Sequence, residues 1–262
     1  MNTYKKLFVI SLVSILVVSS CKEKKKDTTP LTVKTTGKEV SFYAKDSMKV
    51  VGDLYEQNKS QPIILLFHQA RSNAKGEYST IIPKLTAKGF NVLAIDQRSG
   101  GQLFGNYNRT LAGSTYKNYS YCEAYPDLEA ALLYISKQGY QGKKIVWGSS
   151  YSAALAIKLA HNHQNKIHGV LAFSPASGGP MKDCNADNLL KTLKTPLLLL
   201  RPSKEMGIES VKKQFNLATE FNHQTYIAKD GVHGSSMLVA VRTKTAVDDT
   251  WNKVFRFLET FK

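Results

Sequence analysis

Three serines lie close together in the segment KIVWGSSYSAALAIKLA, residues 144–160, at positions 149, 150 and 152. A strand-like run precedes them and a helix-like run follows. A nucleophile elbow needs such a strand-to-helix turn, which lifts one side chain above the edge of a sheet. The turn is tight, so the residues two before and two after the nucleophile must be small. Gly148 and Ser152 meet this condition around Ser150, which is the candidate nucleophile.

The two neighbouring serines fit an elbow less well. Centring the turn on Ser149 places the bulky Trp147 two residues before it. Centring it on Ser152 is sterically acceptable, but that hydroxyl would then lie inside the helix. Around Ser150 the pattern is G-x-S-x-S, a weak signal by itself, so the assignment depends on finding the groups that would activate the hydroxyl.

A serine hydroxyl becomes a good nucleophile only when a base removes its proton, and the base needs an orienting acid. His233 lies in the glycine-flanked segment DGVHGSS, after the last predicted strand. Glu205 follows the apolar run TPLLLL by a few residues. The chain order is therefore nucleophile, acid and base, at Ser150, Glu205 and His233.

Apolar runs typical of buried strands alternate with amphipathic stretches typical of helices. The expected strands are two within 40–57, then 62–67, 91–96, 144–147, 167–173, 195–200 and 224–228. The expected helices are 77–90, 126–138, 152–161, 209–221 and 251–261. This alternation predicts an α/β fold with a mostly parallel sheet and helices on both faces. Ligand crevices in such sheets lie at the carboxyl ends of the strands.

Residues 97–125 break this alternation with glycines, asparagines and several tyrosines. Loops this long within one domain are usually lids or binding loops. The segment leaves the carboxyl end of a predicted strand, so we expect a short lid over the site. Four of its tyrosines are suited to stacking on a sugar or an aromatic group, or to packing the lid itself: Tyr107, Tyr116, Tyr119 and Tyr121.

From about residue 39 to its end, the chain resembles the α/β-hydrolase superfamily, near its dienelactone-hydrolase-like and esterase branches. The resemblance rests on the G-S-S-Y-S elbow and on the order of the three candidate residues. The family acid usually follows a strand in the context P-x-L-x-x-x-G-x-x-D, where this chain has Glu205 at the acid position and Pro202 where glycine is common. Asp183 and Asp187 are the rival acids. Dienelactone hydrolases proper carry cysteine at the elbow, so Ser150 argues against that activity.

The resemblance also implies an oxyanion hole after the strand 62–67. The segment FHQARSN occupies the place of the family's His-Gly segment, with Gln69 instead of glycine. The expected donors are the backbone N–H of Gln69 or Ala70 and that of Tyr151. His68 is expected to be structural.

A second family resemblance lies in DQRSGG, residues 96–101, which is similar to the family's Asp-x-Arg-Gly-x-Gly turn. There Asp96 and Arg98 usually brace the turn. The alternative is that Arg98 meets a substrate carboxylate.

The N-terminus has the organisation of an export signal. MNTYKK is positively charged, LFVISLVSILVV is apolar, and V-S-S-C resembles the lipobox of bacterial lipoproteins. We predict a lipoprotein signal peptide over 1–20, a lipidated Cys21, a flexible tether over 21–38 and a hydrolase domain over 39–262. An ordinary secretory signal is the alternative. The predicted location is a bacterial membrane, on its periplasmic or cell-surface face.

The 262 residues carry 36 Lys and Arg against 20 Asp and Glu, a net charge of +16. This excess favours anionic partners, but the lysines are scattered, which is more typical of a solvated surface than of a nucleic-acid interface. Cys122 and Cys184 are compatible with a disulfide or with two free thiols. The chain has no C-x-x-C, P-loop or dinucleotide motif, so neither metal nor cofactor is expected.

Together these features predict a serine hydrolase that cleaves a carboxylic ester of a small molecule or carbohydrate through an acyl-enzyme on Ser150. A peptidase or acyltransferase with the same three residues is one alternative. A lipoprotein that uses the fold as a binding module without turnover is another. The sequence leaves the oligomeric state open.

Overall fold

The computed structural model describes Met1, residues 36–112 and residues 118–262. Apart from Met1, the predicted signal peptide falls outside these residues, as do the lipidation site Cys21 and nearly all of the predicted tether. Lys38 already belongs to the first strand, one residue before the predicted start of the domain. Within the described residues, no helix is both long enough and apolar enough to cross a membrane.

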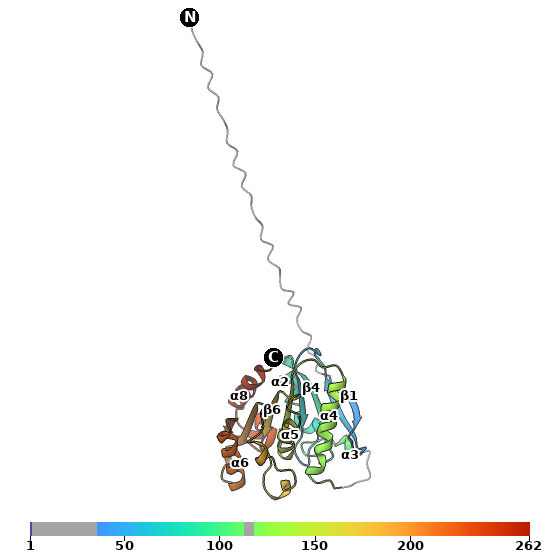
Figure 1. The fold of residues 1–262 in the computed structure, drawn as a ribbon, viewed down its shortest axis with the longest axis vertical. Helices are drawn as coiled ribbons and strands as arrows, with labels where there is room; N and C mark the ends of the chain where they lie inside the picture. The colour runs from blue at the N-terminus through green and yellow to red at the C-terminus, as the bar shows by residue number, and fades with distance from the viewer. Residues whose placement is uncertain (2–35, 113–117) are drawn as a thin grey trace. The chain divides into compact units, whose positions relative to one another are not determined.

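The centre of the domain is an eight-stranded sheet in the order β1-β2-β4-β3-β5-β6-β7-β8 (Figure 1). Its strands are β1 (Lys38–Tyr43), β2 (Lys49–Tyr55), β3 (Ile63–Phe67), β4 (Asn91–Asp96), β5 (Lys144–Ser149), β6 (Gly169–Phe173), β7 (Leu197–Pro202) and β8 (Gln224–Ala228). Only the β1–β2 and β2–β4 pairs are antiparallel. The predicted α/β class with a mostly parallel sheet is confirmed.

Helices cover both faces of the sheet. One face carries α4 (Tyr125–Lys137), α5 (Tyr151–Asn162) and α6 (Glu209–Glu220), and the other carries α1 (Ala74–Tyr78), α2 (Ile82–Ala87) and α8 (Asp248–Glu259). Figure 1 shows α4 and α5 side by side across the sheet. Alternate residues of the central strands face opposite layers, so Leu65 packs with the first set and Leu66 with the second. Since both layers are apolar, the strands appear in the sequence as continuous apolar runs.

The predicted helix over 77–90 is wrong, because the structure contains two short helices there, α1 and α2. Pro83 lies in the first turn of α2. A proline inside a longer helix would remove one hydrogen bond and clash with the carbonyl four residues earlier. The break at residues 79–81 avoids both penalties.

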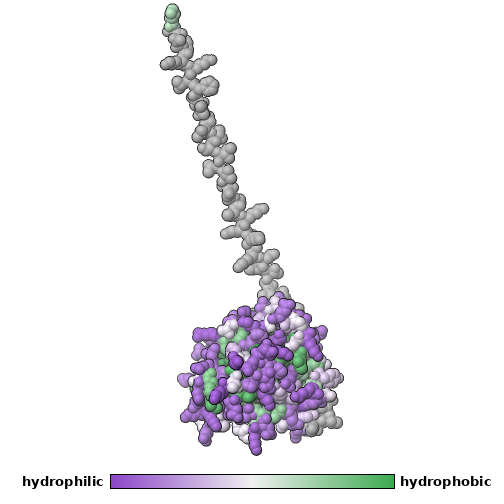
Figure 2. Space-filling model, in the orientation of Figure 1, coloured by the Kyte–Doolittle hydropathy of each residue, from purple (hydrophilic) through white to green (hydrophobic). Residues whose placement is uncertain are grey.

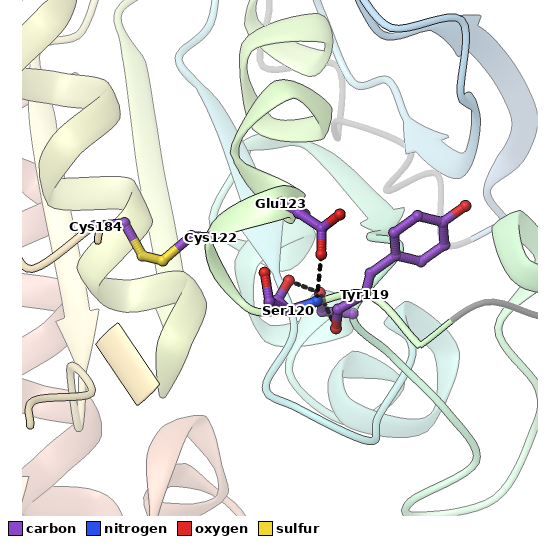
Figure 3. Close-up of a disulfide and its surroundings, with 6 residues drawn as sticks. Tyr119, Ser120, Cys122, Glu123 and Cys184 are labelled. Atoms are coloured by element: carbon purple, nitrogen blue, oxygen red, sulfur yellow. Dashed lines mark hydrogen bonds between the residues drawn. A yellow bond between two sulfur atoms is a disulfide. The ribbon is translucent and has the colours of Figure 1, made fainter. Parts of the chain in front are cut away.

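The loop over 97–125 contains the short helix α3 (Arg109–Ala112) and the 3-10 turn η1 (Cys122–Ala124). Residues 113–117, with Tyr116, lie outside the described residues. Cys122 forms a disulfide with Cys184, which ties the end of this loop to the segment after β6 (Figure 3). Beside it, Glu123 accepts a hydrogen bond from the Ser120 N–H at 2.7 Å.

The remaining short elements are α7 (Ala240–Thr243) and the 3-10 turns η2 (Gly179–Met181), η3 (Asp187–Leu189), η4 (Ser203–Glu205) and η5 (Gly234–Leu238). The face of the domain visible in Figure 2 is mainly hydrophilic, with small separate apolar areas. The parallel register aligns the ends of β3, β5, β6 and β7, since Phe67 pairs with Gly148, and Phe173 pairs with both Ser149 and Leu200. Segments that leave these strands therefore meet at one edge.

Candidate active site

Ser150 stands at the sharp turn between β5 and α5, with φ 63° and ψ −123°. A residue with a side chain rarely adopts a positive φ, and strained positions of this kind cluster at functional sites. The turn is held by the Ser150 N–H, which donates to Phe173 O at 2.8 Å, and by the Ser150 carbonyl, which accepts from the Ala176 N–H at 3.0 Å. A Cβ on Gly148 would lie 2.3 Å from Ser152 O. Only glycine fits there, as the elbow pattern requires.

The three serines differ in what their hydroxyls do. Ser149 Oγ accepts from the Ser235 N–H at 2.9 Å, and Ser152 Oγ donates to Phe67 O at 2.7 Å. Both of these serines are fully buried. Ser150 is partly exposed, and among the described residues no hydrogen bond engages its hydroxyl. The structure therefore leaves Ser150 as the serine of this segment that is available for chemistry.

Glu205 and His233 are close in space, although one precedes β8 in the sequence and the other follows it. Glu205 ends η4, which directly follows β7, and His233 directly precedes η5. The distance from His233 Nδ1 to Glu205 Oε1 is 2.5 Å. With Nδ1 donating to the carboxylate, Nε2 is left as the basic nitrogen, which is the tautomer that a general base needs.

Arg201, a residue that the sequence analysis missed, forms an ion pair with Glu205. It lies in β7, is almost completely buried, and its Nη1 is 2.9 Å from Glu205 Oε2. Burial opposes ionisation of Glu205, but the hydrogen bond with His233 and the charges of His233 and Arg201 outweigh burial and lower the pKa of the carboxyl group. Glu205 is therefore held as the carboxylate. The available signal was an arginine at the end of an otherwise apolar strand, in TPLLLLRP.

The rival acids do not reach His233. Asp187 Oδ1 accepts from Gln214 Nε2 at 2.6 Å, and Gln214 Oε1 in turn accepts from Arg201 at 2.6 Å. Asp187 thus belongs to the outer part of the Arg201 network. Asp183 is exposed. Glu205 is the carboxylate, of the three considered, that contacts the imidazole.

Hydrogen bonds to the elbow and the neighbouring strands fix the loop that carries His233. The Gly234 N–H donates to Ser174 Oγ at 3.0 Å, and the Ser235 N–H donates to Ser149 Oγ at 2.9 Å. Ser235, two residues after His233, therefore contacts Ser149, the residue before Ser150. No hydrogen bond joins the Ser150 hydroxyl to His233 in the part of the chain that the structure describes. Such contacts often tighten only when substrate binds.

The structure reduces the number of candidate oxyanion donors from three to two. The Gln69 N–H donates to Glu77 Oε2 at 2.7 Å, so the Gln69 backbone alternative is wrong. Within residues 36–112 and 118–262, no acceptor engages the N–H of Ala70 or of Tyr151. Tyr151 is the first residue of α5, where helical N–H groups lack internal partners and carry partial positive charge. Ala70 and Tyr151 are the two remaining candidate donors.

His68 is structural, as expected. It is fully buried, and its Nε2 accepts from the Gln97 N–H at 2.9 Å. Nδ1 must then carry the proton that is donated to Gln69 O at 2.8 Å. Burial lowers the pKa of the imidazole, which favours this neutral form. His68 thereby ties the oxyanion segment to the turn after β4.

Arg98 also braces the structure instead of presenting a free charge. Its Nε donates to Asp127 Oδ1 at 3.0 Å, its Nη2 donates to Asp127 at 2.6 Å, and its Nη1 and Nη2 both contact Asp46. Two carboxylates already occupy this guanidinium. The structural alternative for Arg98 is therefore favoured over contact with a substrate carboxylate.

Glu77, which accepts a hydrogen bond from the Gln69 N–H, is a second residue near the site that the sequence analysis missed. It is completely buried in α1. Burial is the main cause that raises the pKa of its carboxyl group to about 7, against the opposing effects of the Ser149 hydroxyl, the Gln69 amide, Arg242 and His233. Glu77 Oε1 has no hydrogen-bond partner in the described part of the chain. A neutral carboxyl group is less costly in such a place than a carboxylate.

Glu77 predicts a pH-dependent stability. An acid whose folded pKa is raised from 4.5 to about 7 binds its proton more tightly when folded, so stability falls as the pH rises between these values. The total loss is about 3 kcal/mol. We expect Glu77→Gln to remove this loss, so that its free energy of unfolding relative to wild type improves between pH 5 and pH 8. Urea denaturation at both pH values measures this. The exposed Glu209→Gln is the control, and an unchanged difference for Glu77→Gln would contradict the assignment.

A cavity of about 590 Å³ adjoins the oxyanion segment. It is lined by Ala70, Arg71, Tyr107 and Tyr121, together with further residues of the loop over 97–125. Tyr107 is exposed, while the ring of Tyr121 stacks on Tyr151 at 4.9 Å. Both predicted substrate-binding tyrosines thus border this cavity, and Tyr121 also packs the loop against the elbow.

Comparison with known proteins supports this description of the fold. Residues 58–225 match the family model described as serine aminopeptidase, S33. No curated protein matches the chain. An esterase from Pyrococcus furiosus has a similar structure, with a TM-score of 0.65 and 20% identity over 86% of this chain and 91% of its own.

Two further solved structures illustrate the range of proteins with this fold. An acylaminoacyl peptidase from Pyrococcus horikoshii matches with a TM-score of 0.62 and 14% identity, over 86% of this chain and 41% of its own. An α/β-hydrolase from a Penicillium species matches with a TM-score of 0.65 and 13% identity, over 86% of this chain and 99% of its own. At these identities the likeness concerns the fold.

Proposed function

Because this chain belongs to the serine aminopeptidase S33 family of hydrolases, we propose that it is a serine hydrolase that cleaves carboxylic esters. The observation that carries the proposal is the strained elbow, where Ser150 lies beside the loop of His233 with a hydroxyl that no described residue engages. No feature of the family match requires an ester substrate, so the substrate class rests on the site itself.

In the proposed reaction, Ser150 Oγ attacks the ester carbonyl carbon while His233 Nε2 takes the hydroxyl proton. The tetrahedral oxyanion is stabilised by the N–H groups of Ala70 and Tyr151, each worth about 2.7–4 kcal/mol in the barrier. Collapse breaks the bond to the alcohol, which leaves with the proton from His233. Water, deprotonated by His233, then hydrolyses the acyl-enzyme and restores Ser150. Glu205 stays ionised and stabilises the imidazolium.

A peptidase or acyltransferase with the same residues is the second candidate, suggested by the family description and by the acylaminoacyl peptidase of similar fold. An aminopeptidase binds a protonated α-amine, for which a carboxylate is the natural partner. Among the described residues, none lining the cavity is Asp or Glu. This favours an ester over a peptide with a free N-terminus.

Reaction with a fluorophosphonate probe, followed by turnover of matched ester and peptide substrates, tests the proposal. A serine hydrolase is labelled at Ser150 and cleaves the ester. Cleavage of peptides alone would favour the peptidase. A folded protein that is neither labelled nor active would instead be a binding module without turnover.

We further propose that the protein is exported and anchored by lipid on Cys21. The N-terminal sequence supports this, and the Cys122–Cys184 disulfide suits an oxidising compartment. Acyl chains on Cys21 would hold the domain on the membrane by burying methylene groups. We expect wild type in the membrane fraction and Cys21→Ser in the soluble fraction on cell fractionation. Equal distribution of the two would exclude this anchor.

A further inference from the structure

Arg71 directly follows the candidate oxyanion donor Ala70 and lines the adjoining cavity. Its side chain is exposed. Within the described residues, no hydrogen bond or ion pair engages its guanidinium. Among the described residues, this arginine therefore presents an unpaired positive charge at the cavity that the candidate oxyanion donor Ala70 also lines.

The backbone around Arg71 holds it in an unusual conformation. Its φ is +63°, a left-handed value that a residue with a side chain adopts only when its surroundings impose it. The Arg71 carbonyl accepts from the Leu103 N–H at 2.7 Å, and the next carbonyl, Ser72 O, accepts from the Gly101 N–H at 2.7 Å. Glycine would satisfy this backbone with less strain. The backbone conformation therefore gives no reason for an arginine at position 71.

The charges around the cavity favour an anionic ligand. Its described lining contains two arginines and neither Asp nor Glu. Arg98 is neutralised by Asp127 and Asp46. Of the described lining residues, Arg71 is thus the arginine whose charge remains available. A guanidinium in this state is well suited to bind a carboxylate through two parallel hydrogen bonds.

We propose that the cavity binds a carboxylate carried by the ester substrate, and that Arg71 is its ligand. The proposal rests on the esterase function above and specifies its substrate class as esters that bear a negative charge close to the scissile bond. The Cα atoms of Ala70 and Arg71 are consecutive, about 3.8 Å apart. The oxyanion would therefore be held by the backbone of one residue and the carboxylate by the side chain of the next, so the reach of the Arg71 side chain sets the upper limit on the spacing between the two groups of the substrate.

Two matched substrate pairs test this and show on which side the charge lies. For the acyl side, 4-nitrophenyl hydrogen succinate is compared with 4-nitrophenyl butyrate. For the alcohol side, 3-acetoxybenzoate is compared with phenyl acetate. We expect Arg71→Gln to lower kcat/KM about tenfold for the charged member of at least one pair, with the neutral member changed by less than about threefold. We call the ratio of kcat/KM for the charged ester to kcat/KM for its neutral partner the charge preference. Added salt should lower this charge preference in wild type.

Three variants of the same chain separate this role from other effects. Arg71→Lys keeps the charge and should retain part of the preference. Arg71→Gly removes the charge while suiting the backbone, so its loss of preference could not come from misfolding. Lys75→Gln removes one exposed charge of nearby α1 that does not line the cavity, and should leave the preference intact. A loss with Lys75→Gln equal to that with Arg71→Gln would overturn the proposal, as would equal effects of Arg71→Gln on charged and neutral esters.

A binding measurement makes the inference independent of turnover. Calorimetric titration of Ser150→Ala with the charged and neutral esters should show preference for the charged ester, and adding Arg71→Gln should abolish it. If wild type cleaves no ester but this preference is present, the proposed reaction is wrong and the carboxylate site stands. If neutral esters are cleaved but the charged ester is preferred neither in turnover nor in binding, the esterase stands and the carboxylate site is wrong.

Discussion

Replacing Ser150 with alanine is expected to lower kcat for a simple ester by about four to six orders of magnitude and to abolish fluorophosphonate labelling. The substitution removes the atom that forms the acyl-enzyme, while the oxyanion donors and the cavity remain. Because the Ser150 hydroxyl makes no hydrogen bond among the described residues, its loss should change the stability little. The melting temperature should therefore stay close to that of wild type.

The matched control is Ser152→Ala, two residues further along the chain and inside α5. Ser152 Oγ donates to Phe67 O and accepts from the Ser149 N–H, and it is buried. Its removal should lower the free energy of unfolding by about 1–3 kcal/mol, since the buried Ser149 N–H loses the hydroxyl that accepts from it, while Phe67 O keeps the Tyr78 hydroxyl as a donor. The protein should still be labelled. The reverse pattern, with Ser152→Ala unlabelled and Ser150→Ala labelled, would show that the nucleophile has been assigned to the wrong serine.

Replacing Glu205 with glutamine is expected to lower kcat by about three to four orders of magnitude. The neutral amide can no longer stabilise the imidazolium of His233, and it can hold the imidazole in the wrong tautomer. Labelling should become much slower without disappearing, because Ser150 remains. Single-turnover labelling rates and steady-state kinetics measure both effects.

The structure sets a specific control for this change. Glu205 also pairs with the buried Arg201, so Glu205→Gln should lower the free energy of unfolding as well, and activity must be measured below the melting transition. Asp187→Asn disturbs the same network through Gln214 without touching His233. We expect Asp187→Asn to keep most of the activity. An equal loss of kcat in the two variants would mean that the network as a whole matters and that Glu205 has no separate role.

The sequence by itself determined the elements whose signals are local. Strands buried on both faces appear as apolar runs, and the predicted bounds of β4 and β8 agree with the structure. The elbow could be found because its constraint is steric and acts within a few residues, as the close approach of Ser152 O to Gly148 shows. Where a local signal was underweighted, the prediction was wrong, as at Pro83, which separates α1 from α2.

The tertiary structure decided which groups become partners, because contacts between distant segments depend on the register of the sheet and the packing of its loops. Nothing near Gln69 in the sequence indicates that Glu77 occupies its N–H, and nothing near Glu205 identifies it over Asp187 as the partner of His233. The charge of Arg71 likewise depends on what surrounds it: Arg98 is paired by two carboxylates from distant segments, whereas no described residue pairs with Arg71. The sequence gives the residue types and their order. Whether a hydrogen-bond donor or a charged group has a partner depends on the folded structure.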